Sequence, residues 1–422
     1  MATARRTPEP MDHATPARFL AAHEATATAP ISSLLRWPAP PRDQCAARLR
    51  QQLPPPRAGL RISVIIPAKD EAITLPAALA ALAAQVTAHG QPLPFDSFEV
   101  IVLANNCQDA TAAVVRRQAQ RFPRLALHVA ELCLAGDTAH VGRARRLLMD
   151  EACARLEQVG QPNGVIASTD ADTQVAPDWL AAIQAEIVGG ADAVGGRIFT
   201  SAEEAGPVAL RRIQGQDTAY RLLCARLEDQ TDPVALDRWP RHHQHFGASL
   251  ALTAWAYRRV GGLPEVRFLE DEALCQELRR HDLALRHSPQ VRVLTSARRQ
   301  GRVEVGLSWQ LNEGLHMSQQ QREPHVENPV QLLRRWQLRR QLRACWAGSP
   351  GAEPAATTAR LGLPVATVLA RMREATTFGA LWEWTLAHSP NLTMNLVPLS
   401  RALLVLPRLI RNGVVAEQRP VV

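Results

Sequence analysis

The stretch RISVIIPAKDEAITLPAALAALAAQ, residues 61–85, decides the fold class. It opens with a β-branched run at residues 62–66, which predicts a buried strand that ends at Pro67. An Ala- and Leu-rich segment follows and predicts a helix over residues 74–88. A strand followed at once by a helix is the first half of a βαβ unit, so this stretch favours an α/β protein.

The same alternation continues toward the C-terminus. Further strands are predicted at residues 98–103, 125–129 and 164–168, and helices at residues 111–121 and 142–158. Because this spacing is typical of βαβ units, we expect a mostly parallel central sheet flanked by helices. Residues 195–310 are less regular, and the chain beyond residue 320 is helical and basic.

Composition excludes several classes of protein. Of the 422 residues, 46% are hydrophobic and 21% are charged, which argues against wholesale disorder. The net charge of +8 comes almost entirely from arginines that are spread along the chain without a basic, aromatic-rich stripe, so nucleic acid is not an expected partner. The seven scattered cysteines form no CxxC pair, and neither a secretory signal nor an 18-residue apolar run is visible. These features favour a cytoplasmic protein with reduced thiols.

Acidic residues follow the fourth predicted strand, at the edge where parallel sheets bind their ligands. Residues 170–172 (Asp-Ala-Asp) can direct two carboxylates to one side of the chain. Two carboxylates with waters and a diphosphate suit Mg²⁺ or Mn²⁺, because hard cations take oxygen ligands. The alternative is a simple helix start capped by Asp172 or Thr173.

Polar residues also follow the first two strands. Glu71 can accept hydrogen bonds from a nucleobase or a ribose, or it can belong to a capping cluster for the next helix. Asn105 and Asp109 can hold the same parts of a nucleotide, or they can simply form a tight turn.

Two arginine-bearing segments are candidates for binding phosphate. Arg143 and Arg145 stand at a predicted helix start, where bidentate contact with an anion is favourable; the alternative is a solvated helix face. The arginine loop at residues 298–302, with Arg299 and Arg302, follows a strand-like run at residues 291–295 and could neutralise a diphosphate leaving group; the alternative is an exposed basic turn.

A second acidic cluster lies at residues 270–272. Adjacent carboxylates raise one another's pKa, which would help one of them accept a proton near neutral pH. The same residues could simply enrich a helix start in acids. The histidine-rich residues 242–245 lack ligands at zinc spacing and are expected to form a polar pocket wall.

These motifs, over roughly residues 60–310, resemble those of the family 2 glycosyltransferases, which have the GT-A fold. The stretches that carry the resemblance are residues 63–71, 105–111, 170–172, 256–263 and 270–271. The resemblance implies an α/β nucleotide-diphospho-sugar transferase of the hexosyltransferase type. It would move a sugar from a UDP- or GDP-linked donor to an acceptor hydroxyl, with inversion by single displacement. On this basis we expect a Pro-rich leader in residues 1–60, a GT-A catalytic domain in residues 61–318 and a helical C-terminal region in residues 319–422.

The resemblance also implies roles for individual residues. Asp271 would be the base that deprotonates the acceptor. The donor nucleotide would be bound by Pro67, Ala68, Glu71, Asn105, Asp109, Arg143, Asp170 and Ala171. Asp172 and Asp170 would hold Mn²⁺ or Mg²⁺, with His287 as a weaker candidate for a third ligand. The donor and acceptor pocket would be lined by Gly247, Ser249, Glu270, Arg299 and Arg302.

The sequence departs from processive members of the family. Residues 299–303 lack the tryptophan of the Gln-x-x-Arg-Trp motif, so we expect a single-addition enzyme. The acceptor could be a small molecule, a glycan or a lipid-linked molecule. Residues 330–346 could form a basic helix on the inner face of a membrane, although helices that pack on the catalytic domain are the favoured alternative. A sugar-phosphate nucleotidyltransferase and a non-catalytic nucleotide-binding scaffold are the competing functions.

Overall fold

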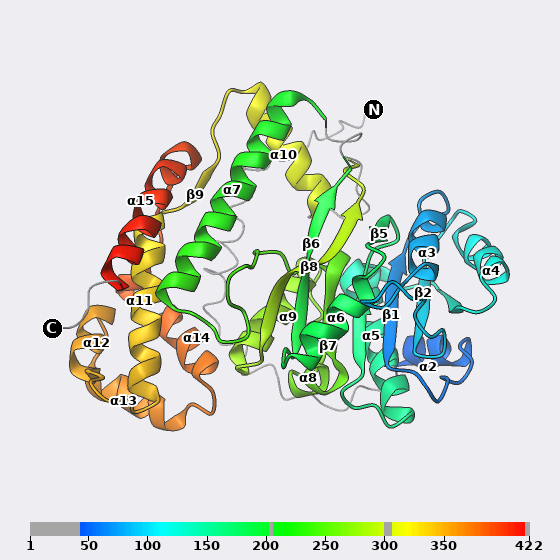
Figure 1. Cartoon of the computed structure of the whole chain (residues 1–422), viewed down its shortest axis with the longest axis horizontal. Coiled ribbons are helices and arrows are strands. Elements are labelled where there is room, and N and C mark those ends of the chain that lie inside the picture. The colour runs from blue at the N-terminus through cyan, green and yellow to red at the C-terminus, as the bar shows by residue number, and fades with distance from the viewer. Residues whose placement is uncertain (1–42, 202–205, 299–305, 418–422) are drawn as a thin grey trace, which may run out of the picture.

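The computed structural model describes residues 43–201, 206–298 and 306–417 and is shown in Figure 1. In this part of the chain an eight-stranded sheet has the order β3-β2-β1-β4-β7-β6-β8-β5. A small two-stranded sheet pairs β10 with β9. The strands are β1 (Ile62–Ala68), β2 (Phe98–Asn105), β3 (Ala126–Leu132), β4 (Val165–Ser168), β5 (Thr173–Val175), β6 (Ala193–Thr200), β7 (Leu250–Thr253), β8 (Leu285–Thr295), β9 (His325–Glu327) and β10 (Leu396–Pro398).

The large sheet is mostly parallel, as the βαβ spacing predicts. Strands β3, β2, β1 and β4 pair in parallel, and β8 pairs in parallel with β6. Strand β7 is antiparallel to both β4 and β6, and β5 is antiparallel to β8. Because β7 runs against β4, the start of β7 lies at the carboxyl end of β4, where Leu250 pairs with Ser168.

Helices bury both faces of the sheet, which explains why the strand sequences are apolar without alternation. Ile65 belongs to a core shared with α2 (Gln44–Gln51), α5 (Val141–Gln158), α8 (Ala254–Arg259) and α9 (Glu270–Arg280). Its neighbours Val64 and Ile66 belong to the core on the other face, formed with α3 (Leu75–Ala83), α4 (Thr111–Arg121) and α6 (Trp179–Val188).

Helix α3 is shorter than the sequence predicts. It ends at Ala83, whereas the Ala-rich pattern predicts a helix to residue 88. The chain leaves the helix because Gln85 donates to the carbonyl of Ala176 at 2.8 Å and accepts from the amide of Leu180 at 2.9 Å. Tertiary contacts with the segment before α6 therefore override local helix propensity.

The helical region contains more of the chain than residues 319–422. It comprises α7 (Val208–Thr231), α10 (Leu307–Gln319), α11 (Pro329–Trp346), α12 (Pro354–Leu361), α13 (Val365–Glu374), α14 (Phe378–His388) and α15 (Leu399–Glu417). Helix α7 lies beside α15 and α11 at the opposite end of the molecule from β2, as Figure 1 shows. Their shared core includes Tyr220, Leu227, Trp336 and Leu406.

Helix α11 packs on two sides. Trp336 joins the core with α7 and α15, and Leu342 joins a second core formed with α12, α13 and α14. The favoured alternative has these helices pack on the catalytic domain, and α11 does contact α7, which lies within the predicted catalytic residues 61–318. In the described part of the chain, no helix combines the length and apolar character that crossing a bilayer requires.

Candidate active site

The predicted acidic motifs meet at the carboxyl edge of the large sheet. Glu71 follows β1, and Asp170 and Asp172 follow β4. Glu270 and Asp271 begin α9, and Gly247 begins the short helical turn η3 (Gly247–Ser249) that leads into β7. The antiparallel direction of β7 is what brings Gly247 to this edge.

Arg145 joins these segments. This buried guanidinium donates from Nε to Glu270 Oε1 at 3.0 Å and from Nη2 to Asp170 Oδ1 at 3.0 Å. It also donates from Nη1 to the carbonyl of Gly247 at 3.1 Å. Burial disfavours the charge, but the carboxylates of Asp170 and Glu270 outweigh burial and raise the pKa of Arg145. One permanent positive charge thus holds the two acidic motifs together.

Asp271 is placed to accept a proton. Its Oδ2 accepts the amide of Gly247 at 2.8 Å, and its Oδ1 accepts the amide of Glu272 at 2.8 Å. Burial, followed by the neighbouring charge of Glu270, raises the pKa of Asp271 to about 6. A carboxylate with such a pKa can act as a general base near neutral pH.

Asp172 is a second carboxylate of this edge whose pKa is raised. Burial and the charge of Asp170 raise the pKa of Asp172 to about 6, and the charge of Arg298 opposes that rise. Its ionised form therefore lacks full compensation in the protein alone. A further positive charge at this place would stabilise it.

Arg298 is the first residue of the arginine loop predicted at residues 298–302, and it is the arginine of that loop that the structure places at the site. Its Nη1 donates to Glu71 Oε2 at 2.8 Å, its Nη2 bonds to Glu71 Oε1, and Nη2 also lies 3.2 Å from Asp172 Oδ2. Arg298 reaches the site because it follows β8. The carboxyl end of β8 lies at the same edge of the sheet as that of β6, its parallel neighbour. Arg299 and Arg302, the predicted pocket residues of this loop, lie outside the described residues.

Other predicted residues lie elsewhere or have structural partners. Arg143 pairs with Asp43 and Glu265, and so it links α2 to the segment before α9. Ser249 Oγ accepts the indole N–H of Trp179 at 3.0 Å. Both ring nitrogens of buried His287 are engaged, Nδ1 with Asp237 at 2.8 Å and Nε2 with His245 at 3.1 Å. These contacts therefore do not support His287 as a metal ligand.

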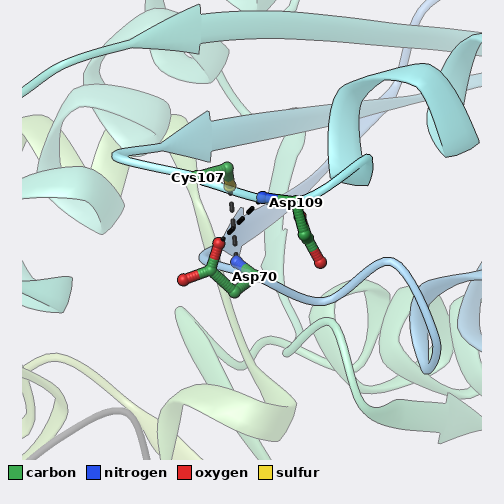
Figure 2. Close-up of side chains that lie close together, drawn as sticks. All are labelled: Asp70, Cys107 and Asp109. Carbon is green, nitrogen blue, oxygen red and sulfur yellow. Dashed lines mark hydrogen bonds between the residues drawn. The ribbon is translucent and has the colours of Figure 1, made fainter.

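The end of β1 and the end of β2 are joined by a second group of side chains, which Figure 2 shows. Asp70 Oδ1 accepts the amides of Gln108 and Asp109, and Cys107 Sγ lies 3.4 Å from the amide of Asp70. Asp109 in turn accepts the amides of Ala72 and Thr111. These bonds to backbone amides connect the loop after β1 with the loop after β2, and this connection explains why the three side chains lie together. The buried Asn105 lies at the end of β2, beside this connection.

The donor set at Asp170 and Asp172 fits a divalent cation of the hard type. The two carboxylates offer oxygen ligands, and Asp172 carries a charge that burial disfavours. Among the described residues, the three-ligand grouping that lies within bonding reach of one ion is at Asp70, Cys107 and Asp109, not at Asp170 and Asp172. A cation at Asp170 and Asp172 would therefore be held by these two carboxylates together with a diphosphate and water, an arrangement that Mg²⁺ commonly takes.

Comparisons with known proteins agree with this architecture. Residues 63–241 match the family model described as "Glycosyl transferase family 2". No curated protein matches the chain. The mostly parallel, helix-flanked sheet with extra C-terminal helices is the GT-A-type architecture that the sequence resemblance predicted.

Several solved structures are similar to the chain. A mannosyltransferase from Pyrobaculum calidifontis, solved with GDP-Man and Mn²⁺, is 20% identical over 89% of this chain and 97% of its own, with a TM-score of 0.41. S. aureus TarS 1-349, solved with UDP-GlcNAc, is 14% identical over 78% of this chain and 90% of its own, with a TM-score of 0.38. M. tuberculosis glucosyl-3-phosphoglycerate synthase is 14% identical over 65% of this chain and 84% of its own, with a TM-score of 0.35. Similarities at this level assign neither donor nor acceptor.

Proposed function

We propose a specific reaction for this glycosyltransferase, whose residues 63–241 form a glycosyl transferase family 2 domain. The enzyme transfers a hexose from a UDP- or GDP-linked donor to an acceptor hydroxyl. Transfer is a single displacement with inversion, and one sugar is added in each binding event. The neighbouring mannosyltransferase and TarS were solved with GDP-Man and UDP-GlcNAc, which supports both donor types as candidates.

The observation that carries the proposal is the bridging of the two acidic motifs by Arg145. Through this bridge, Asp170 lies on one side of a single guanidinium and Glu270, the neighbour of Asp271, on another. A donor diphosphate at Asp170 and an acceptor at Asp271 would then meet at the same edge of the sheet. This is the requirement for a direct displacement, in which base, acceptor and leaving group act together.

Each residue has a defined task in this reaction. Asp271 takes the proton of the acceptor hydroxyl, and the amide of Gly247 keeps its carboxylate in place. Asp170 and Asp172 would hold Mn²⁺ or Mg²⁺, which when bound neutralises charge on the diphosphate leaving group. Glu71, which is bonded to Arg298, and Asp109 would bind the nucleobase and ribose. The donor site would be completed by Pro67, Ala68 and Asn105 near the strand ends and by Ala171 in the loop after β4.

The acceptor and the cellular location are part of the proposal as well. The acceptor is a small molecule, a glycan or a lipid-linked molecule, and a lipid-linked acceptor would bring the helical region to a membrane surface. The helical region exposes apolar side chains on α11 and α15, where Val330 is 53% and Leu404 is 69% exposed. The contact is proposed at α15, because Leu404 is the more exposed of the two. Co-sedimentation of the full chain with anionic vesicles, with and without Leu404→Asp, tests this contact.

The test of the reaction is a transfer assay with a panel of nucleotide sugars and Mn²⁺ or Mg²⁺. Asp271→Asn removes the base without changing the size of the side chain, so we expect kcat to fall at least about a hundredfold. Asp178→Asn, at an exposed ion pair with Arg292, is the matched control and should leave kcat unchanged. NMR of the first-formed product reports its anomeric configuration.

Three results would contradict the proposal. Equal kcat in Asp271→Asn and wild type would remove Asp271 from the reaction. Release of pyrophosphate from a sugar phosphate and a nucleoside triphosphate would indicate a nucleotidyltransferase. Binding of nucleotide sugars without any turnover across the acceptor panel would favour a scaffold.

A further inference from the structure

A cavity of about 210 Å³ lies between α7, α9 and α11. Its walls include three arginines and three histidines, and α11 contributes an apolar side with Leu332 and Trp336. Pockets that enclose a drug-sized ligand measure roughly 300–1,000 Å³, so this cavity suits a smaller group. Except for His287, its lining residues are separate from the residues predicted for the active site.

Three side chains of the cavity have unused hydrogen-bond donors or an unpaired nitrogen. Arg221 bonds through Nε to Asp217 at 2.8 Å, and its two terminal nitrogens make no hydrogen bond within the described part of the chain. Arg279 has a single long contact there, from Nη1 to Glu272 at 3.4 Å. His243 has a buried Nδ1 for which residues 43–201, 206–298 and 306–417 provide no partner. A guanidinium carries five N–H donors, so most of the capacity of both arginines is free.

The carboxylates that line the cavity do not oppose an anion, because arginines already neutralise them. Glu228 lies 2.6 Å from Arg241 and 2.8 Å from Arg339. Burial disfavours its charge, but Arg339 and Arg241 lower the pKa of Glu228 to about 2, so it stays ionised and paired. Glu327 lies 3.5 Å from Arg335. The unpaired N–H donors of Arg221 and Arg279 therefore make the cavity favourable for an anion.

We propose that this cavity binds a small anionic group, a phosphate or a carboxylate, held by Arg221 and Arg279 with a hydrogen bond from His243. Burial and the charge of Arg221 lower the pKa of His243 to about 2, so the ring is neutral and contributes one N–H. The two arginines supply the charge and the bidentate geometry that phosphate and carboxylate groups prefer. The site is additional to the donor site, and its existence does not depend on the proposed reaction.

The cavity is connected to the start of α9. Arg279 contacts Glu272, the residue after Asp271. Glu272 is bonded to His245 at 2.6 Å, and His245 to His287, which lines the cavity. An anion that draws Arg279 away from Glu272 would leave this chain of hydrogen bonds intact but change the charge beside Asp271.

The test measures binding by isothermal titration of the full chain with inorganic phosphate and, separately, with acetate, without any nucleotide sugar. Arg221→Gln and Arg279→Gln should each weaken binding at least about tenfold, because each removes charge-assisted hydrogen bonds. Arg221 and Arg279 have side chains that are 31% and 49% exposed, so both variants are expected to fold, which circular dichroism verifies. Arg212→Gln, at an exposed position of α7, is the matched control and should bind like wild type.

Two results would overturn the proposal: no binding of either anion to wild type at millimolar concentration, or equal affinity in wild type and both glutamine variants. Competition with glycerol phosphate identifies the source of the group. Displacement of inorganic phosphate by glycerol phosphate supports a site for an anionic group on a larger molecule, and exclusion of glycerol phosphate supports a site for the free anion. Because no sugar transfer is measured, failure of this site and failure of the proposed reaction are distinguishable.

Discussion

At the scale of single residues, burial controls the chemistry of Asp271. Its carboxyl group titrates near pH 6 because burial and the charge of Glu270 disfavour the ionised form. A protonated carboxyl cannot accept the acceptor's proton, so the base is lost as the pH falls through this value. Asp172 titrates in the same range, but a bound cation would keep it ionised.

The pH profile of kcat follows from the raised pKa of Asp271. At saturating donor and Mn²⁺, we expect kcat to fall below about pH 6, the pKa of Asp271. Glu270→Gln removes the adjacent negative charge and frees Arg145 to stabilise the Asp271 carboxylate, so the acid limb should move to lower pH. An acid limb at the same pH in this variant would mean that another group controls the profile.

At the scale of elements, a buried ion pair ties helix α5 to strand β2. Arg155 donates from Nη2 to Glu99 Oε2 at 2.6 Å and from Nε to Oε1 at 2.9 Å. Ser63 on β1 donates to the same carboxylate at 2.9 Å. This contact supports the helix that carries Arg145, and so it fixes the scaffold of the active site.

Breaking that pair should be costly. Glu99→Gln leaves the guanidinium of Arg155 buried with its charge uncompensated, which costs about 3–5 kcal/mol of unfolding free energy. Glu131→Gln, at the exposed pair with Arg116, is the matched control and should cost roughly 1 kcal/mol at most. Urea denaturation followed by circular dichroism measures both values. Equal losses of unfolding free energy in the two variants would show that the buried pair contributes no more to stability than the exposed pair.

At the scale of the whole molecule, local sequence patterns predict the parallel half of the sheet, β3-β2-β1-β4, but not the contacts between distant residues at the site. Strands β1 to β4, part of β8 and the helix at residues 111–121 follow from apolar runs and periodicity, which depend on neighbours in sequence. Strands β5, β6 and β7 are not predicted by these patterns. The bridge from Arg145 to Glu270 joins residues 125 positions apart, and that from Arg298 to Glu71 joins residues 227 apart. Such pairings depend on the strand order, which a single sequence does not reveal.

The packing of α7 gives a prediction at the same scale. Tyr220 and Leu227 of α7 are covered by α11 and α15, so the sequence-based boundary at residue 319 divides a shared core. We expect a chain that ends at residue 318 to expose this core and to lose a cooperative thermal transition. An unfolding transition at the temperature of the full chain would show instead that residues 319–422 fold as a separate domain.

The donor site is tested most directly by calorimetric titration of the full chain with the nucleotide sugar that supports transfer, in the presence of Mn²⁺. The proposed mechanism predicts that the double variant Asp170→Asn, Asp172→Asn binds the donor at least about tenfold more weakly than wild type. Asp178→Asn should bind it like wild type. Unchanged affinity in the double variant would contradict a donor diphosphate at the carboxyl end of β4.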